Sequence, residues 1–287
     1  TVRCCTQNGV RGGNATVHFP IWHPEIEDIL VLKNNKGTED NRVRRMDYSI
    51  QISKLFYERF MNEGDITLIS PHMAPGLYEA FGTDEFDDLY LKYEADKTIP
   101  KKTVPAQDLF FDLLKERAET GRIYIMNLDH CNSHSSFKDK VSMSNLCQEI
   151  TLPTTPIQDI HDEQGEIALC ILSAVNVGGL NDLSELENIC DLSVRALEQI
   201  IDYQDYPVKA AEVSTKKRRS LGIGYIGLAH YLAKNNVKYS DPKAWDLVDR
   251  LTEAFQYNLL RASCNIAMEK GKCEGFERTK YADGLLP

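Results

Sequence analysis

The pattern of hydrophobic and polar positions divides the chain into short strand-like and longer helix-like segments. Alternating or β-branched stretches predict strands at residues 15–19, 48–52, 65–69, 122–127, 145–152 and 167–172. Apolar residues spaced three or four apart predict helices at 25–32, 53–62, 76–81, 86–95, 105–120, 183–203, 221–233 and 242–270. Strands that alternate with helices are typical of an α/β fold, with parallel strands covered by helices.

No internal repeat, low-complexity segment or clear linker interrupts this pattern. We therefore interpret residues 1–287 as a single domain. Both ends look cut, because the chain starts Thr-Val-Arg-Cys-Cys without Met and stops at Gly-Leu-Leu-Pro. We expect an internal piece of a longer protein, and thus an incomplete domain.

The composition is that of an ordinary soluble globular protein, with 42% hydrophobic and 26% charged residues. A net charge of -10 argues against binding to DNA, RNA or an anionic membrane. No signal peptide opens the chain, and the longest uncharged run, 167–181, is too short to span a bilayer. We expect a cytoplasmic protein, in which the basic run 216–219 forms a solvated face.

Candidate chemistry is concentrated in the segment Ser-Asn-Leu-Cys-Gln-Glu-Ile. In an extended strand, Asn145, Cys147 and Glu149 would share one face, because side chains at i, i+2 and i+4 point the same way. An amide, a thiol and a carboxylate would then meet at one place. The same spacing also fits a half-buried strand in which the cysteine only packs, so the spacing leaves both interpretations open.

The glycines of Gly222-Ile-Gly224-Tyr-Ile-Gly227 match a dinucleotide-binding pattern. The expected context is missing, since the polar residues 216–220 precede the pattern and Asp241 opens a helix instead of ending a strand. We expect these glycines to allow close helix packing. An NAD-dependent dehydrogenase is the least favoured function.

His130 and His134 are potential metal ligands, but they would align only on a helix. The segment is rich in Asn and Ser, follows a predicted strand, and has no Cys-x-x-Cys partner. We expect a hydrogen-bonded turn here and no metal site.

Taken together and in order, the motifs closely resemble the large (α) subunit of class I ribonucleotide reductase, most of all the class Ia enzymes of bacteria and phages. The central motifs are Ser144-Asn-Leu-Cys147-Gln-Glu149-Ile and Glu166-Ile-Ala-Leu-Cys170. Further matches run from end to end: Gly9-Val-Arg-Gly-Gly, Val31-Leu-Lys-Asn-Asn-Lys-Gly, Met46-Asp-Tyr, Thr120-Gly-Arg-Ile-Tyr-Ile, Asp129-His-Cys-Asn, Asp202-Tyr-Gln-Asp-Tyr-Pro and Arg218-Arg-Ser-Leu-Gly-Ile-Gly.

The resemblance implies a ten-stranded α/β barrel with the catalytic cysteine on a finger loop inside it. Residues 1–287 would form a single, incomplete catalytic barrel domain. The segments that bind the effector, any ATP-cone and the carboxy-terminal redox cysteines would lie outside this chain, and we expect the fragment alone to be inactive.

The resemblance also implies the reaction, which is reduction of ribonucleoside diphosphates to 2′-deoxyribonucleoside diphosphates for DNA precursor synthesis. Cys147 would form a thiyl radical, Glu149 would be the base, Asn145 would hydrogen-bond the ribose, and Ser144 would lie near the substrate. Cys170 would be one member of a redox-active cysteine pair whose partner lies outside this chain.

The glycine-rich loop at residues 7–14 gains a role from the same resemblance. In the family, this loop lies between the substrate base and a specificity effector bound at a dimer interface. Gln7 and Arg11 match its working residues. The remaining loop residues assigned to the specificity loop are Gly9, Gly12, Gly13 and Asn14.

The implied cofactors and partners all come from outside this chain, which would bind no cofactor or metal directly. The radical would come from a di-metal small (β) subunit, and the effectors would be the nucleoside triphosphates ATP, dATP, dTTP and dGTP. Thioredoxin or glutaredoxin would be the reductant, and the α subunit would form a homodimer. Two alternatives stay open: a cobalamin-dependent class II reductase, and a non-catalytic or split-gene piece that acts only in assembly with other α-subunit segments.

Overall fold

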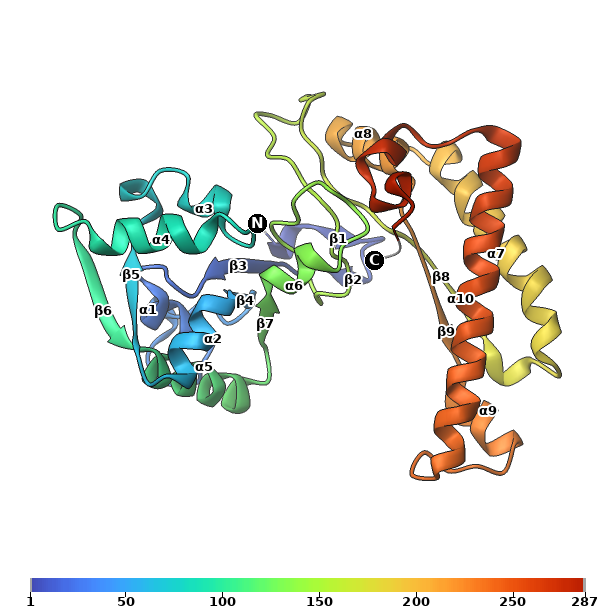
Figure 1. Cartoon of the computed structure of the whole chain (residues 1–287), viewed down its shortest axis with the longest axis horizontal. Coiled ribbons are helices and arrows are strands. Elements are labelled where there is room, and N and C mark those ends of the chain that lie inside the picture. The colour runs from blue at the N-terminus through green and yellow to red at the C-terminus, as the bar shows by residue number, and fades with distance from the viewer. Residues whose placement is uncertain (1, 286–287) are drawn as a thin grey trace. The chain divides into compact units, whose positions relative to one another are not determined.

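The computed structural model describes residues 2–285, which form two compact units (Figure 1). One unit comprises residues 2–153 and the other comprises Thr154–Leu285. Strands and helices alternate in both, so the predicted α/β class is confirmed. Within the described residues the strands form four separate sheets of two or three strands. The sheets are therefore not closed into a barrel within this part of the chain.

The first unit is built on a three-stranded parallel sheet in the order β3–β4–β7. Its strands are β1 (Thr6–Gln7), β2 (Arg11–Gly12), β3 (Thr16–Pro20), β4 (Asp47–Ile52), β5 (Asp65–Ile69), β6 (Lys101–Pro105) and β7 (Ile123–Asn127). Its helices are α1 (Ile26–Leu30), α2 (Lys54–Met61), α3 (Leu77–Ala80), α4 (Phe86–Ala95), α5 (Ala106–Thr120) and α6 (Leu128–Ser133). The pairs β1–β2 and β5–β6 are antiparallel.

The central strand β4 is buried on both faces, but the two faces differ in chemistry. Tyr48, Ile50 and Ile52 belong to the hydrophobic core, which also contains buried side chains of α1, α2 and α5. Because strand side chains alternate, Ser49 and Gln51 lie on the opposite face, and both are fully buried. The sheet therefore has one apolar face that packs against helices and one polar face.

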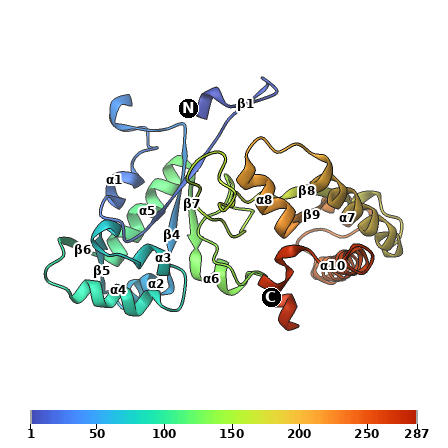
Figure 2. The same ribbon diagram turned by 90° about the horizontal axis from the view of Figure 1, so that it is seen from above.

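The second unit combines a pair of parallel strands with long helices. Its elements are α7 (Leu186–Tyr203), α8 (Lys209–Arg218), α9 (Leu228–Lys234), α10 (Pro242–Lys270), β8 (Ile171–Asn176) and β9 (Leu221–Ile226). Helices α7 and α10 run side by side (Figure 2). Val175, Ile223 and Tyr225 of the two strands pack with Cys190 and Phe255 of these helices.

Several predicted elements were wrong or displaced. Residues 221–226 form strand β9 and not the start of a helix, and residues 145–152 form a turn and a coil segment instead of a strand. Residues 128–133 form helix α6 where a turn was expected, and the glycine-rich loop contains the short β1–β2 hairpin. The strand expected at 167–172 begins at Ile171, and β6 and α8 were missed.

The described residues contain no helix long and apolar enough to cross a lipid bilayer. Each of the two units is compact by itself. That the chain forms a single domain therefore stays a prediction.

Candidate active site

The segment at residues 141–150, which carries Cys147, lies across the polar face of the β3–β4–β7 sheet. The hydroxyl of Thr16 donates a hydrogen bond to the carbonyl oxygen of Leu146 at 2.7 Å. The amide nitrogen of Gln51 donates to the carbonyl oxygen of Ser142 at 2.6 Å. Two strands of the sheet therefore hold the segment at two points along its backbone.

Gln148 produces the tight turn of this segment. Its φ of 63° lies in the left-handed region, which is uncommon for a residue other than glycine. Its backbone N–H donates to the carbonyl oxygen of Asn145 at 3.3 Å, and its side-chain amide donates to the hydroxyl of Ser49. This bond to β4 gives the turn a third attachment to the sheet.

The side chain of Asn145 stabilises the turn internally. Its Oδ1 atom accepts a hydrogen bond from the backbone N–H of Ile150 at 3.0 Å, and the hydroxyl of Ser144 lies 3.3 Å from the same oxygen. No described residue accepts a hydrogen bond from the NH₂ group of Asn145. That group is therefore the donor left for a ligand.

Cys147 lies at the exposed tip of the turn and faces strand β7. Its thiol lies beside the side chain of Tyr124. Burial raises the pKa of Tyr124, and the neighbouring Cys147 and Asp47 raise it further, so the phenol stays neutral and can serve as a donor. The sequence analysis missed Tyr124, although alternation along 123–127 would have placed it on the polar face.

Glu149 is exposed, and no hydrogen bond or ion pair joins it to another residue in the described part of the chain. The strand argument for a shared face is therefore wrong, because Gln148 reverses the chain between Cys147 and Glu149. Asn145, Cys147 and Glu149 lie on or directly beside one turn, and the side chains of Cys147 and Glu149 are exposed there. A thiol and a carboxylate are thereby both accessible to a ligand above it.

His18 of β3 lies on the same polar face, and neither of its ring nitrogens has a hydrogen-bond partner among the described residues. Burial lowers the pKa of His18, and the nearby backbone of Ser144 offsets only part of this effect. The imidazole is therefore neutral at pH 7, and it adds no charge beneath the cysteine-bearing turn.

The β1–β2 hairpin contains the residues predicted to form a specificity loop. Arg11 is exposed on β2, and the amide of Asn14 donates to the carbonyl oxygen of Gly12 at 3.1 Å. A Cβ atom on Gly13 would lie 2.3 Å from the carbonyl oxygen of Cys5, so only glycine fits there. The side chain of Gln7 lies outside the described part of the structure.

Next to this hairpin lies a hollow of about 590 Å³ with a positive excess. Four cationic side chains and two carboxylates line it, together with Gly12, Gly13 and Asn14. The charged residues are Lys33, Arg44, Arg45, Arg122, Asp47 and Glu119. Asp47 forms ion pairs with Lys33 at 2.5 Å and with Arg122 at 3.7 Å, so part of the positive charge is already compensated.

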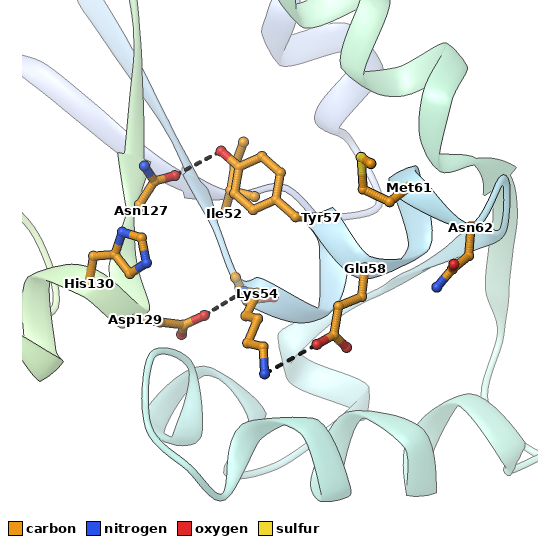
Figure 3. Close-up of a pocket in the computed structure, with 10 residues that line it drawn as sticks. Ile52, Lys54, Tyr57, Glu58, Met61, Asn62, Asn127, Asp129 and His130 are labelled. Carbon is orange, nitrogen blue, oxygen red and sulfur yellow. Dashed lines mark hydrogen bonds and ion pairs between the residues drawn. The ribbon is translucent and has the colours of Figure 1, made fainter.

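A second, more apolar hollow of about 300 Å³ lies at the carboxyl ends of β4 and β7 (Figure 3). The hydroxyl of Tyr57 donates to Asn127 at 2.8 Å along its rim, and Lys54 pairs with Glu58 at 3.2 Å. His130 also lines it. None of the predicted catalytic residues lines this hollow.

Cys170 belongs to the second unit and lies directly before β8, half-buried. Four residues upstream, Glu166 is buried and accepts hydrogen bonds from Arg218 at 2.6 Å and from Lys217 at 2.6 Å. Burial acts to raise the pKa of Glu166, but these bonds outweigh it and keep that pKa below its usual range. The segment that leads to Cys170 is therefore anchored to the end of α8.

This anchor corrects the interpretation of the basic run at 216–219 as a solvated face. Arg218 is buried against Glu166, and Arg219 pairs with Glu198 at 2.6 Å and Asp202 at 2.8 Å. Most of the run thus serves internal ion pairs.

The described residues contain no group of three or more His, Cys, Asp or Glu side chains arranged to hold a metal ion. The rings of His130 and His134 do come together on and just after α6, 5.6 Å apart and edge to face. That pair arises from helical spacing, which the turn prediction had excluded.

Comparison with known proteins gives a match over the whole chain. Residues 1–287 match the family model described as ribonucleotide reductase, barrel domain. The ribonucleoside-diphosphate reductase subunit alpha of Haemophilus influenzae is 58% identical over 291 residues. The ribonucleoside-diphosphate reductase 1 subunit alpha of Escherichia coli is 54% identical over 291 residues, and the ribonucleoside-diphosphate reductase subunit alpha of phage T4 is 44% identical over 294 residues.

Each of these three alignments covers 100% of this chain but only 38% of the relative. The chain thus spans well under half the length of the curated relatives it matches.

Proposed function

The chain belongs to the ribonucleotide reductase barrel-domain family, and we propose that the subunit containing it reduces ribonucleoside diphosphates to 2′-deoxyribonucleoside diphosphates. The observation that carries the proposal is the turn around Cys147. This turn presents an accessible thiol beside Tyr124, and hydrogen bonds from the polar face of a sheet hold the turn in place. Such a thiol can exchange a hydrogen atom with a bound sugar.

In the proposed reaction, the thiyl radical of Cys147 takes the 3′ hydrogen of the ribose and becomes a thiol. Glu149, which is exposed beside it, takes the proton of the 3′ hydroxyl. The NH₂ group of Asn145 donates to a ribose oxygen, which agrees with its lack of an acceptor among the described residues. Ser144 supports the turn next to the substrate.

Cys170 supplies reducing equivalents in the same proposal. Replacement of the 2′ hydroxyl by hydrogen, with the oxygen leaving as water, requires two electrons and two protons, which two thiols provide when they join in a disulfide. Cys170 is one of these thiols, and its partner belongs to chain outside these residues. Thioredoxin or glutaredoxin then reduces the disulfide, and the 3′ hydrogen returns from Cys147 to the sugar.

The relatives are named as alpha subunits, which supports a separate small (β) subunit as the partner of this one. We propose that this partner generates the radical at a di-metal centre and that the α subunit forms a homodimer in the cytoplasm. The cationic hollow beside Gly12, Gly13 and Asn14 supports nucleotide phosphates near the predicted specificity loop. Gln7, Gly9 and Arg11 would there couple a bound nucleoside triphosphate (ATP, dATP, dTTP or dGTP) to the choice of substrate base.

The test of this function is Cys147→Ser in the complete subunit, assayed with a small subunit, thioredoxin and a ribonucleoside diphosphate. We expect turnover to fall by about 1,000-fold or more, with the substrate dissociation constant unchanged within about threefold. Cys264→Ser is the matched control, because Cys264 is also an exposed cysteine and lies on α10. Retained turnover in Cys147→Ser would contradict the radical role.

Cys170→Ser separates the two thiol roles. We expect hydrogen abstraction to begin, visible as substrate-dependent loss of the radical signal, and deoxynucleotide formation then to stall. Turnover that needs cobalamin and no small subunit would instead favour the class II alternative.

A further inference from the structure

We propose that Gly222 is a positioning residue for Cys170: the missing side chain at position 222 makes the space in which the cysteine sulfur lies. This inference rests on the proposed redox role of Cys170. It also gives a function to the first glycine of the motif at residues 222–227.

The geometry that carries the proposal is the contact between β9 and the start of β8. Leu172 is the register partner of Gly222 in the parallel pair, and Cys170 lies two residues earlier. A Cβ atom on Gly222 would lie 2.8 Å from the Sγ atom of Cys170 and 2.6 Å from Cδ2 of Leu172. Both distances are far below the roughly 3.5–4.0 Å at which non-bonded carbon atoms make favourable contact.

Backbone conformation does not explain this glycine. Gly222 is one of the glycines outside the left-handed region, so any residue could adopt its backbone angles. What excludes a side chain is the space that the sulfur and Leu172 already occupy. A strand glycine of this kind typically marks a close approach by a neighbouring group.

Gly224, two residues further along the same strand, is an internal comparison. It is paired with Ala174, it also lies outside the left-handed region, and nothing lies within 4 Å of a Cβ atom built on it. The same Gly→Ala substitution therefore changes strand composition equally at both positions. Only at 222 does the new methyl group meet the thiol.

A methyl group at position 222 should displace the sulfur. Leu172 is 60% exposed and its side chain can swing aside. Cys170 has a single side-chain torsion, so its sulfur must move to another rotamer, a shift of about 3 Å. A disulfide needs its sulfurs about 2.05 Å apart with a defined torsion, so a shift of this size removes the sulfur from its partner.

The experiment compares Gly222→Ala with Gly224→Ala in the complete subunit. The first measurement is the rate at which Cys170 reacts with dithiobis(nitrobenzoate), followed by mass spectrometry of the peptide that contains it. The second is kcat and KM for a ribonucleoside diphosphate. In Gly222→Ala we expect the thiol reaction rate to change by about threefold or more and kcat to fall by about tenfold or more, with KM within about twofold.

Gly224→Ala should leave the thiol reaction rate and both kinetic constants within about twofold of the parent. An unchanged thiol reaction rate in Gly222→Ala would overturn the positioning role. An altered thiol rate with unchanged kcat would instead overturn the proposed redox function of Cys170, and the two failures are thereby distinguishable.

A second background protects the test against misfolding. Leu172→Ala removes the other side chain that the new methyl group would meet, so that the combination Leu172→Ala/Gly222→Ala tests the contact with sulfur alone. If this double variant melts at the temperature of Leu172→Ala and its Cys170 reacts at the same rate, the proposal is wrong.

Discussion

Replacement of Glu166 by glutamine should destabilise the second unit more than any surface charge change in it. Glu166 and Arg218 have side chains that are only 6% and 4% exposed, and their charged atoms lie 2.6 Å apart. Glu166→Gln keeps the shape of the side chain but removes the carboxylate charge that faces the buried Arg218 guanidinium. Breaking a buried ion pair from one side costs about 3–5 kcal/mol.

Two features of the structure reduce this cost. The glutamine oxygen can still accept a hydrogen bond from Arg218, which retains about 1 kcal/mol. Lys217, the other donor to Glu166, is 30% exposed and can turn toward water. We therefore expect the free energy of unfolding to fall by about 2–4 kcal/mol.

The assay is urea unfolding followed by far-ultraviolet circular dichroism, which reports the helices α7, α8 and α10 of this unit. Glu212→Gln is the matched control, because Glu212 pairs with Lys216 at 2.8 Å on the exposed side of α8. That substitution should leave the free energy of unfolding nearly unchanged. The double variant Glu166→Gln/Arg218→Met removes the buried guanidinium together with the carboxylate that it faces, so its loss should be smaller than that of Glu166→Gln by at least about 1 kcal/mol.

The pH dependence has a definite sign. The pKa of Glu166 is lower in the folded protein than in the unfolded chain, so its contribution is fully present above the unfolded pKa of about 4.3. The contribution is lost as the pH falls through the folded value, and Glu166→Gln should remove this acid-dependent part. A loss below about 1 kcal/mol at neutral pH, or strict additivity in the double variant, would refute the reasoning.

Three further predictions concern the first unit. Gln148→Val should lower the free energy of unfolding by about 1–2 kcal/mol, because a β-branched residue is strained at a φ of 63°. Gln148→Gly should lower it by less, and equal losses in the two variants would contradict the turn geometry. Because the pKa of His18 is lowered in the folded state, the free energy of unfolding should fall as the pH drops from about 6.5 to the pKa of His18 in the folded protein. His18→Gln should remove this pH dependence in chemical unfolding measured from pH 7 to 5. In a spectrophotometric titration at alkaline pH, the difference between the parent and Tyr124→Phe should have its midpoint above about 10, and a midpoint at or below that value would contradict the placement of Tyr124 beside Cys147.

Helices with clear end signals could be predicted from the sequence almost to the residue. Helix α10 has the predicted bounds 242–270 because its start and stop are local. Asp241 accepts a hydrogen bond from the backbone N–H of Lys243 at 3.0 Å, Pro242 occupies the first turn, and Gly271 follows the last residue. No distant contact is needed to define such an element.

Strand β9 shows how a correct local signal can be misassigned. Leu221, Ile223 and Tyr225 alternate with glycines, which is a strand period, and they pack toward the helices. We predicted that these residues begin the following helix, because glycine has no marked preference for strands and the apolar run continues into α9. The left-handed Gly227 between the two elements was the available signal of a break.

The turn around Cys147 could not have been predicted from its own residues. Its attachments come from far along the chain: Thr16 is 130 positions from Leu146, and Gln51 is 91 positions from Ser142. Alternating residue types suggested a strand, whereas the remote bonds and the left-handed Gln148 impose a turn. The motif thus singled out candidate residues whose roles stay predictions, and it did not predict their local geometry.

Two hydrogen bonds from the sheet fix the path of this turn through its backbone, independently of its reactive side chains. Thr16 and Gln51 donate to carbonyl oxygens of the backbone, which every residue type possesses. The course of the segment at those points therefore does not depend on which side chains it carries. A substitution at Cys147 or Glu149 removes a reactive group while its support persists, so loss of activity in such a variant reports on chemistry and not on a displaced loop.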